Sequence, residues 1–387
     1  MEENTLNPKL ILFGAGASVP AGIPSAIDMF EKIYTDLSAE KAIWNEIGGA
    51  INLAIGGIQL RNATINQRPL VKIDIEDLYA TLRELTYRNQ NIIAPFVGSW
   101  SQELISVESP KLKEYSGLLT DMLELDLRET FNRNQFSSTR STEVNLPKFR
   151  DALRSTLRVI NGEGASSEFV FACEVILSQI SNRVWISDAD KVSYLDPLIK
   201  SSNKRPLWIA SLNYDNAIEL AAARGGVSVD IGIQANKVGA NFLGLKPLSL
   251  AKLHGSVNWS INQALTMDIE DKVSRNPALI FGAGNKLKVE GPYLDLLLAF
   301  RNQLNKSKQL EVFGYSFRDS HVNHLLLSWL SQNPDAIIDV IDPALTKEML
   351  FANWNKGLEG QTVRSEVLDK KILIHRLSIS DWISTHY

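Results

Sequence analysis

Short apolar runs recur along the chain, and most of them end in a glycine or a polar residue and lead into a segment with helical spacing. These runs occupy residues 9–13, 206–213, 278–281, 310–313 and 336–341. Continuous apolar runs of this length are typical of strands that are buried on both faces of a parallel sheet. Helical patterns follow at residues 25–37, 217–223, 293–304, 322–330 and 346–354. This alternation predicts an α/β fold with a Rossmann-like, doubly wound parallel sheet.

The stretch from about residue 40 to about residue 200 shows helical spacing with little of the two-residue alternation typical of strands. Asp74 is an N-cap candidate for a helix over residues 74–85, in which leucines form an apolar stripe. The same period appears at residues 115–131, 148–160 and 168–180. We therefore predict a core formed by residues 1–38 and 203–387, and a helical insertion subdomain over residues 39–202.

The composition excludes a disordered or fibrous chain, since 44% of the 387 residues are apolar and 22% are charged. A formal net charge of −4 argues against nucleic-acid binding through bulk positive charge. Cys173 is the only cysteine, so neither an internal disulfide nor a four-cysteine zinc site can form. His321 and His324 are the remaining metal candidates, but a polar helix edge explains them more simply, and we expect no metal.

The first residues are acidic, and no basic segment precedes an apolar stretch, so we predict no signal peptide. Residues 10–27 are uncharged over a membrane-spanning length, but they contain several glycines and prolines that would break a helix. We interpret this segment as a strand and a loop, and we expect a soluble, cytoplasmic protein.

A glycine-rich segment, Gly14-Ala15-Gly16-Ala17-Ser18, lies where the first predicted strand ends and a helix approaches. Glycine at such a point allows backbone N–H groups to come close to a phosphate. The segment lacks the Gly-Lys-Ser/Thr ending of a Walker loop. It also has Val19 where the dehydrogenase fingerprint requires a third glycine, and the next glycine is Gly22. A strand-to-helix turn with no ligand is the alternative.

Polar side chains follow several further strands, at the carboxyl ends where open α/β sheets bind their ligands. Asn213 could orient a water or a hydroxyl group, while Asp215 could face the ligand or simply cap the next helix. His254 precedes a glycine in an expected exposed turn, where the alternatives are a general base and a solvated histidine. The nearby Ser256 suggests a Ser/His hydrolase, but the chain has no Gly-x-Ser-x-Gly elbow.

Two later strands end in the same way. Gly314 allows close backbone approach, and Ser316 offers a hydroxyl to a ribose or a phosphate. Asp342 could accept a hydrogen bond from a ribose hydroxyl, or it could end its strand before Pro343.

The order of these motifs resembles that of the sirtuin (silent-information-regulator) family. The motifs are Gly14-Ala-Gly-Ala-Ser18, Gly22-Ile-Pro24, Asn213-Tyr-Asp215, His254-Gly255 and Gly314-Tyr-Ser316. The resemblance covers the first 30 residues and about 205–345, and it implies a Rossmann-like domain that binds NAD and breaks its bond to nicotinamide. The acidic helix start at 74–77 looks like the one found in bacterial sirtuin-like proteins.

The resemblance also implies a role for each matching residue. Asn213 would position the attacking water or the nicotinamide ribose, His254 would be the general base, and Asp215 would support their loop. Gly14, Ala15, Gly16 and Ser18 would hold the NAD phosphates and the adjacent ribose, and Gly314 and Ser316 would contact the adenosine half. From their positions in the sequence we also expect Gly22 and Asp342 among the NAD-binding residues.

The departures from the family pattern narrow this expectation. Protein-deacylating sirtuins carry a four-cysteine zinc ribbon and an Asp-Phe-Arg segment after Gly-Ile-Pro, whereas this chain has one cysteine and continues with Ser25-Ala26-Ile27. The run from His254 to Trp259 is similar to that of a ribbon-free bacterial branch that resembles NAD-hydrolysing effectors of antiphage defence. We therefore predict an NAD hydrolase that releases nicotinamide and ADP-ribose. A protein deacylase or ADP-ribosyltransferase, and a non-catalytic sensor of NAD or ADP-ribose, are the alternatives.

A lethal NAD hydrolase has to stay silent in healthy cells, so we expect control by self-assembly or by a partner. Several helical faces in the insertion need burial, which favours a homo-oligomer. The resemblance implies a HerA-type hexameric ATPase as the partner, with an Argonaute-type protein as the next choice. We expect neither direct nucleic-acid binding nor a membrane.

Overall fold

The computed structural model of the chain describes residues 7–66, 72–88, 167–234, 236–281, 291–356, 368 and 370–387. It divides into two compact units, Met1–Ala26 with Ser181–Tyr387, and Ile27–Ile180. The predicted boundaries lie elsewhere, at 38/39 and 202/203. They differ because α1 (Ala26–Ala39) groups with the helices of the second unit, whereas the 3-10 helix η4 (Ala189–Leu195) groups with the sheet.

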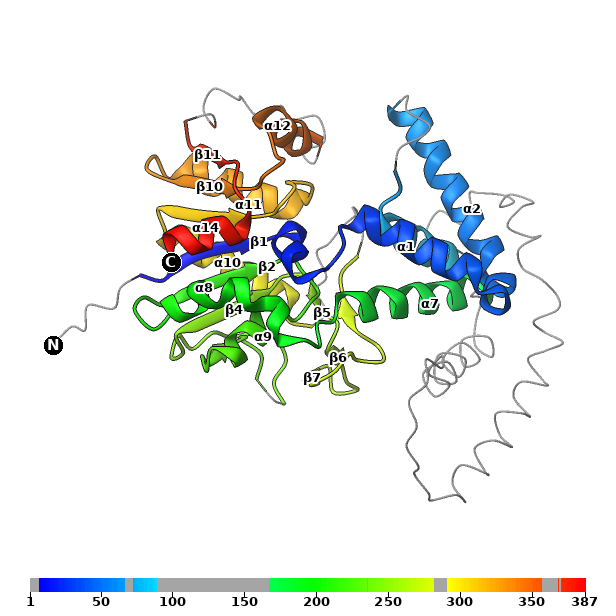
Figure 1. Cartoon of the computed structure of the whole chain (residues 1–387), viewed down its shortest axis with the longest axis horizontal. Helices are drawn as coiled ribbons and strands as arrows, with labels where there is room; N and C mark the ends of the chain where they lie inside the picture. The colour runs from blue at the N-terminus through cyan, green and yellow to red at the C-terminus, as the bar shows by residue number, and fades with distance from the viewer. Residues whose placement is uncertain are drawn as a thin grey trace, which may run out of the picture. The chain divides into compact units, whose positions relative to one another are not determined.

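A seven-stranded parallel sheet with the strand order β11-β10-β9-β1-β2-β4-β3 forms the centre of the first unit (Figure 1). The strands are β1 (Lys9–Phe13), β2 (Leu207–Ser211), β3 (Val229–Asp230), β4 (Leu248–Lys252), β9 (Gln309–Phe313), β10 (Ile337–Ile341) and β11 (Ile372–His375). In the central strand β1, Ile11 lies between Ile209 of β2 and Glu311 of β9. The predicted Rossmann-like, doubly wound parallel sheet is confirmed.

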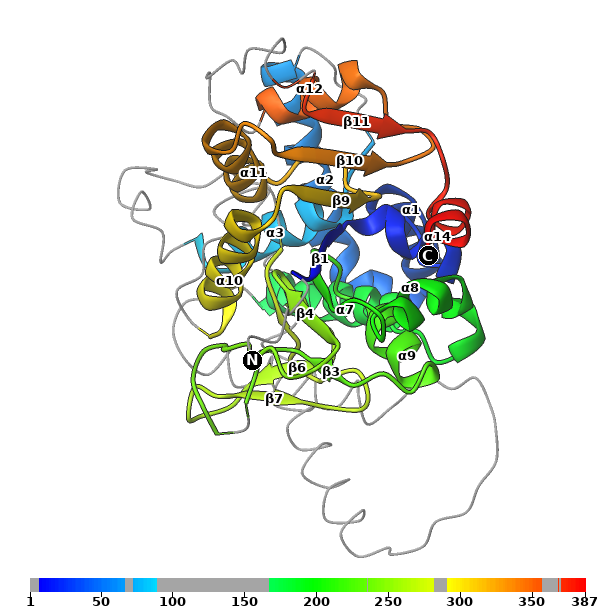
Figure 2. The ribbon, with the colours of Figure 1, turned by 90° about the vertical axis from the view of Figure 1, so that its left-hand side faces the viewer.

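Helices cover both faces of this sheet (Figure 2). One face packs against α10 (Tyr293–Lys306), α11 (Ser320–Gln332) and α12 (Lys347–Lys356). Leu12, Trp208 and Val312 point into that layer and are buried with Phe300 and Leu326 of the helices. The other face is covered by α8 (Asp196–Ser201), α9 (Ala217–Arg224) and α14 (Ile379–His386). Burial on both sides explains why the central strands are continuous apolar runs.

The run at 278–281 is not a strand of the large sheet, contrary to the expectation from its composition. It forms β8 (Ala278–Leu279), which pairs antiparallel with β5 (Gly255–Ser256). A second antiparallel pair joins β6 (Trp259–Ile261) and β7 (Met267–Ile269). Gly255 turns the chain out of the large sheet after β4 with a φ of +83°, and a Cβ there would lie 2.0 Å from the carbonyl oxygen of Ala278. The glycine is required for this close crossing.

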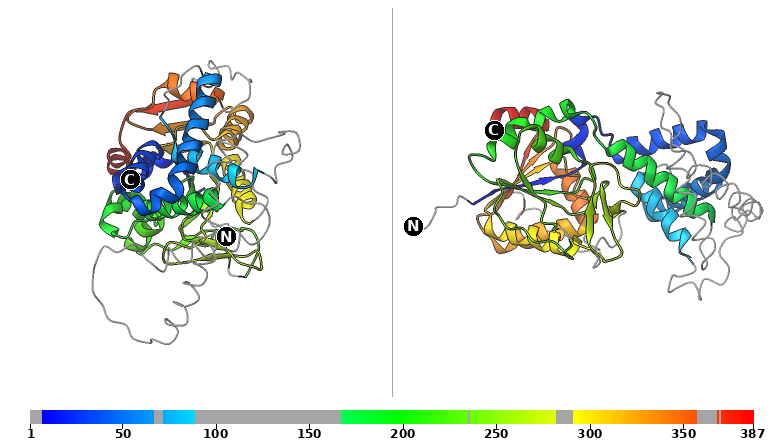
Figure 3. Two further views of the ribbon diagram at one scale, coloured as in Figure 1. Left: turned by 90° about the vertical axis from the view of Figure 1, so that its right-hand side faces the viewer. Right: turned by 90° about the horizontal axis from the view of Figure 1, so that it is seen from below.

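The second unit is helical where the structure describes it. It contains α1, α2 (Lys41–Asn66), α3 (Ile75–Thr86) and most of α7 (Ser167–Val184) (Figures 1 and 3). The rings of Tyr34 and Trp44 join α1 to α2, with centroids 5.3 Å apart. The predicted N-cap is confirmed, since the side chain of Asp74 accepts a hydrogen bond from Glu76 N at 2.9 Å. The helices predicted at 115–131 and 148–160 lie outside the described residues.

Among the described helices, none by itself combines the length and the apolar composition that a membrane span requires, although the bent pair Glu168–Val184 with Ala189–Ser201 meets both criteria together.

Candidate functional site

The residues singled out in the sequence gather at the carboxyl ends of the central strands. The loop after β1 begins at Gly14, the loop after β2 carries Asn213 and Asp215, and His254 follows β4. Gly314 directly follows β9. This end of a doubly wound sheet is where such folds bind their ligands.

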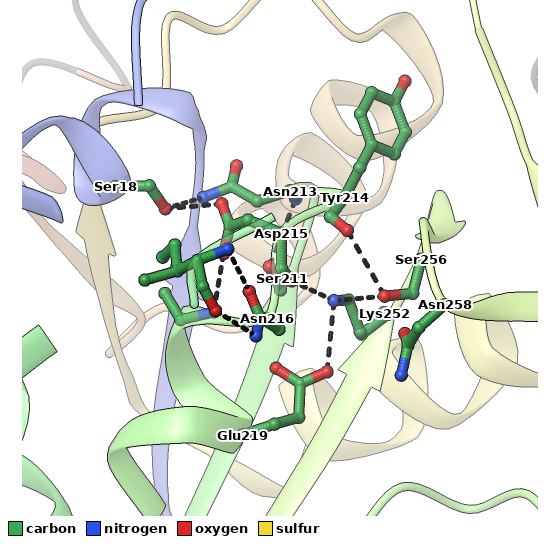
Figure 4. Close-up of polar contacts among 12 residues, drawn as sticks. Ser18, Ser211, Asn213, Tyr214, Asp215, Asn216, Glu219, Lys252, Ser256 and Asn258 are labelled. Atoms are coloured by element: carbon green, nitrogen blue, oxygen red, sulfur yellow. Dashed lines mark hydrogen bonds and ion pairs between the residues drawn. The ribbon is translucent and has the colours of Figure 1, made fainter. Parts of the chain in front are cut away.

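Ser18, Asn213 and Asp215 form one buried hydrogen-bonded network (Figure 4). The hydroxyl of Ser18 donates to Asp215 Oδ2 at 2.7 Å and accepts from Asn213 Nδ2 at 3.0 Å. The same amide nitrogen donates to the carbonyl oxygen of Gly14 at 2.9 Å. Residues almost 200 positions apart in the chain thereby fix one another at the ends of β1 and β2.

The Asn213 side chain has a defined orientation as a result. Both of its amide protons have acceptors, in Gly14 and Ser18, so the oxygen has to point to the other side. Figure 4 shows that Oδ1 is turned away from Ser18. No described residue donates a hydrogen bond to this oxygen. Asn213 therefore presents an acceptor, which suits a water or a substrate hydroxyl.

Asp215 has two functions in the structure. Its Oδ1 atom accepts from the backbone N–H of Ala217, the first residue of α9, at 2.9 Å, although the N-cap position itself is occupied by Asn216 and not by Asp215 as the simpler interpretation predicts. Its Oδ2 atom holds Ser18. Neither contact reaches the amide of Asn213 directly, so Asp215 acts on Asn213 through Ser18.

Lys252 supports the same loop from the end of β4 and was not predicted as a site residue. Its side chain is 1% exposed, and its ammonium group contacts the carbonyl oxygen of Asp215. The two remaining protons reach Ser256 Oγ at 2.8 Å and Glu219 Oε1 at 3.1 Å (Figure 4). A buried ammonium group is stable only when it is paired in this way.

Asn216 and Tyr194 are further supporting residues that sequence reasoning missed. The amide of Asn216 binds both the N–H and the carbonyl of Ile186, at 2.8 and 2.9 Å. The hydroxyl of Tyr194 donates to the carbonyl of Ala17 at 2.7 Å, and burial, with the nearby charge of Asp215, raises its pKa above the ordinary value. In the sequence, the only indication of Asn216 was its place directly after the Asn213-Tyr214-Asp215 motif, and nothing indicated Tyr194.

The glycines of the first loop have a packing function in this structure. The N–H of Gly16 donates to the carbonyl of Gly314 at 2.9 Å, so the loops after β1 and β9 touch backbone to backbone. A Cβ at Gly14 would lie 2.6 Å from Tyr315 Cα, and one at Gly16 would lie 2.8 Å from Gly314 Cα. Gly22 ends the 3-10 helix η1 (Ala15–Ala21) with a φ of +87°. Loop contact thus explains Gly14 and Gly16 without any phosphate.

His254 is buried, at 6% exposure, and does not lie in an exposed turn as the simpler interpretation held. Its Nε2 atom lies 2.9 Å from Oδ2 of Asp319, a buried residue of the loop after β9. Asp319 was not predicted as a site residue, although its place before α11 identifies it as an N-cap candidate. Its partner could not have been found, since the two residues meet only when β4 and β9 are placed in one sheet.

Ser316 and Asp342, the other predicted ligand residues, have partners in the protein. Asp342 Oδ1 accepts from the N–H groups of Ala344 and Leu345 at 2.8 and 2.9 Å, so it forms the turn that ends β10. The partner of Ser316 is at its backbone, where the carbonyl accepts from Asn353 Nδ2 at 2.9 Å, so this bond does not involve the hydroxyl for which a ligand contact was predicted. Across the residues that the structure describes, no three potential ligands of the His, Cys, Asp and Glu types gather around one point.

Comparisons with known proteins give one kind of match. No family model matches the sequence, and no curated protein does. Solved structures do match, among them mutant Sir2 homologues in complex with 2′-O-acetyl ADP ribose, with a TM-score of 0.36 and 12% identity over 56% of this chain and 74% of that chain. Identity at this level transfers no residue roles, so the assignment of roles depends on the motifs and on the geometry described above.

Proposed function

We propose that the chain hydrolyses NAD to nicotinamide and ADP-ribose at the carboxyl ends of β1, β2 and β4. The observation that carries the proposal is that the motifs in sirtuin order converge in space. Ser18, Asn213 and Asp215 share one network, and His254 lies at the end of the adjacent strand β4. The amide and the histidine provide an acceptor and a base at neutral pH.

In this reaction the bond between nicotinamide and ribose breaks, and nicotinamide leaves with the bonding electrons. Positive charge develops on the sugar, and a water adds to the same carbon. The Oδ1 atom of Asn213 is suited to hold that water or a ribose hydroxyl, because its amide is already fixed by Gly14 and Ser18. His254 accepts the proton that the water loses. The products are nicotinamide, ADP-ribose and one proton.

Replacing His254 tests the assignment of the base. For His254→Ala we expect nicotinamide release to fall about 10²–10⁴-fold, since that is the usual effect of removing a positioned base. His324→Ala is the matched control, because His324 is exposed on α11. Nicotinamide and ADP-ribose are quantified by chromatography after incubation with NAD. Equal rates in the two variants would contradict the role of His254.

Product analysis also separates the alternatives. Transfer to an acyl-lysine peptide or to another protein would give nicotinamide without an equal amount of free ADP-ribose. A sensor would bind NAD in calorimetry and release no nicotinamide under any condition.

The proposal extends to the biological role that the resemblance implies, which is depletion of NAD in antiphage defence. A homo-oligomer, with a HerA-type hexameric ATPase or an Argonaute-type protein as partner, would keep the activity silent until it is needed. The assay is therefore run on the chain alone and with each candidate partner, beside a measurement of the oligomeric state by light scattering. Activity that rises on addition of one partner supports this regulation, and activity that is unchanged by both contradicts it.

A further inference from the structure

The hydroxyl of Ser18 lies between a carboxylate and the amide that the proposed mechanism uses. It donates to Asp215 Oδ2 at 2.7 Å and accepts from Asn213 Nδ2 at 3.0 Å (Figure 4). Ser18, Asp215 and Asn213 are buried, with 2%, 6% and 8% of their surface exposed. We infer that Ser18 is a positioning residue, which acts on the reaction through Asn213 and does not bind NAD through its hydroxyl. The inference rests on the proposed function, in which Asn213 Oδ1 holds the water or a ribose hydroxyl.

The direction of this hydrogen-bond chain is set by the carboxylate at its end. A carboxylate can only accept, so the single proton of the Ser18 hydroxyl goes to Asp215. The hydroxyl then presents a lone pair to Asn213, and only the NH₂ group of the amide can bond to it. The carbonyl oxygen of Gly14, 2.9 Å from the same nitrogen, is an acceptor as well. Both neighbours therefore require the NH₂ group, and Asp215 and Ser18 together keep Oδ1 turned toward the substrate side.

The chain also makes Asn213 a stronger acceptor. Hydrogen bonds in a chain that ends on a charged group polarise one another, and the low dielectric of a buried site enhances this effect. Asp215 attracts the proton of Ser18, the Ser18 oxygen attracts the amide proton of Asn213, and electron density shifts toward Oδ1. A more negative Oδ1 binds the proton of a water or a ribose hydroxyl more tightly. The carboxylate thereby acts at Oδ1 without contacting the reacting groups.

The same bonds prevent the Ser18 hydroxyl from binding the NAD phosphates, which is the role that the resemblance implies. The ionised phosphates of NAD offer only acceptors, and the hydroxyl has no second proton to donate. Donation to a phosphate would break the 2.7 Å bond to Asp215 and place a negative charge beside a buried carboxylate. Like charges repel strongly in a buried site. The hydroxyl is therefore committed to the chain.

The backbone next to Ser18 is held from two other elements, so the hydroxyl has one defined position. The hydroxyl of Tyr194 donates to the carbonyl of Ala17 at 2.7 Å. The N–H of Gly16 donates to the carbonyl of Gly314 at 2.9 Å. The glycine-rich loop after β1 thus supports an amide in the loop after β2.

Ser18→Ala tests the inference, because it removes the hydroxyl and adds no new group. We expect kcat for nicotinamide release to fall about 10–100-fold, which is the effect of losing one charge-assisted hydrogen bond. We expect an unchanged Kd for NAD, measured by calorimetry in a His254→Ala background that preserves the NAD. Ser202→Ala is the matched control, since this hydroxyl is 3% exposed and donates to the carbonyl of Ile199 at 2.7 Å, before the start of β2. It should leave kcat and Kd unchanged.

A second variant separates the chain from a merely structural role. Asp215→Asn retains the bond from Ala217 N through its oxygen, but its NH₂ group then faces Ser18, whose proton loses its acceptor. We expect a loss in kcat similar to that of Ser18→Ala. The double variant should lose no more than the more affected single variant, because all three changes break the same chain. If Ser18→Ala does not fold, Ser18→Cys replaces it, since a thiol of similar size is a weak hydrogen-bonding group.

Side-chain amide spectra follow the chain without turnover. In ¹H–¹⁵N spectra of asparagine-labelled protein, with Asn213→Ala for assignment, both Nδ2 protons of Asn213 should exchange slowly with solvent, since both are bonded in a buried site. In Ser18→Ala, the proton that faced the hydroxyl should exchange faster, and the one bonded to Gly14 should stay slow.

The results separate the two claims. A wild-type kcat in Ser18→Ala, or losses that add up in the double variant, overturns the inference. A raised Kd for NAD with an unchanged kcat overturns it as well, and makes Ser18 a ligand of NAD. A wild-type chain that releases no nicotinamide with any partner overturns the proposed function, while the exchange of the two amide protons still decides whether Ser18 holds Asn213.

Discussion

Lys252 is a buried residue that supports the loop carrying Asn213 and Asp215. Its ammonium group joins the end of β4 to the Asp215 carbonyl, to Ser256 and to Glu219. A lysine surrounded by three acceptors is recognisable only once the fold is known. In the sequence it is a charged residue two positions before His254, with nothing to indicate that it is buried.

Replacing this lysine should weaken the fold. Lys252→Met keeps the length of the side chain but leaves buried acceptors without a donor, and we expect the free energy of unfolding to fall by about 3–5 kcal/mol in urea denaturation. Lys308→Met is the control. Its ion pair with Asp335 is exposed, with 83% and 76% of the two side chains accessible, and such pairs contribute little. Equal stability of the two variants would contradict the account of Lys252.

At the same scale, the sequence predicted where these residues lie better than it predicted their surroundings. Asn213 and Asp215 were expected at the carboxyl end of the sheet because they directly follow a strand, and the structure places them there, beside Ser18. The burial of His254 was missed because its partner, Asp319, comes from a distant loop. Local sequence carries no information about such a pair.

Among the elements, the loops after β1 and β9 are joined by glycines. Gly314 has a φ of +59°, and a Cβ there would lie 2.4 Å from the backbone nitrogen of Ala17. The two loops can approach this closely only because both are free of side chains at the contact. The loop that carries Ser18 is thereby fixed to the loop that leads to Asp319.

Substitution of Gly314 separates this contact from the conformational preference of glycine. Gly314→Ala should lower the free energy of unfolding by more than Gly226→Ala, measured by urea denaturation. Gly226 has a similar φ of +65° but nothing within 4 Å of an added Cβ, so that variant has only the backbone cost, about 1–2 kcal/mol. The additional loss in Gly314→Ala reports the loop contact. Equal losses would show that the contact contributes nothing.

The elements themselves were predicted where their own residues determine them. The runs of β1, β2, β9 and β10 were read correctly because both faces of these strands are buried. β3, β4 and β11 were not among the predicted runs. β3 and β11 are short strands at the sheet edges, and Leu373 of β11 is 44% exposed. β4 is buried throughout, but Ser249 and Lys252 interrupt its apolar pattern. The run at 278–281 was misassigned because an apolar segment of four residues does not show which strand it pairs with.

For the molecule as a whole, the fold has one consequence for function. A doubly wound sheet brings loops that are distant in the sequence to one end, and Gly14, Ser18, Asn213, His254 and Asp319 follow its strands there. The predicted α/β class followed from repeated strand–helix alternation, which is a property of the entire sequence. The identity of the reaction depends on the few side chains at that end.

The rate of nicotinamide release by Asn213→Ala tests the central claim most directly. The variant removes the acceptor at Oδ1 together with the bonds to Gly14 and Ser18. Asn203→Ala is the matched control, since Asn203 is exposed and precedes β2 at the opposite end of the sheet. Both are compared with the wild type after thermal melting shows that they are folded. We predict a loss of about 10²–10⁴-fold in Asn213→Ala, comparable with the loss of a positioned catalytic group, and a wild-type rate in the control. A folded Asn213→Ala variant that releases nicotinamide at the wild-type rate would contradict the claim.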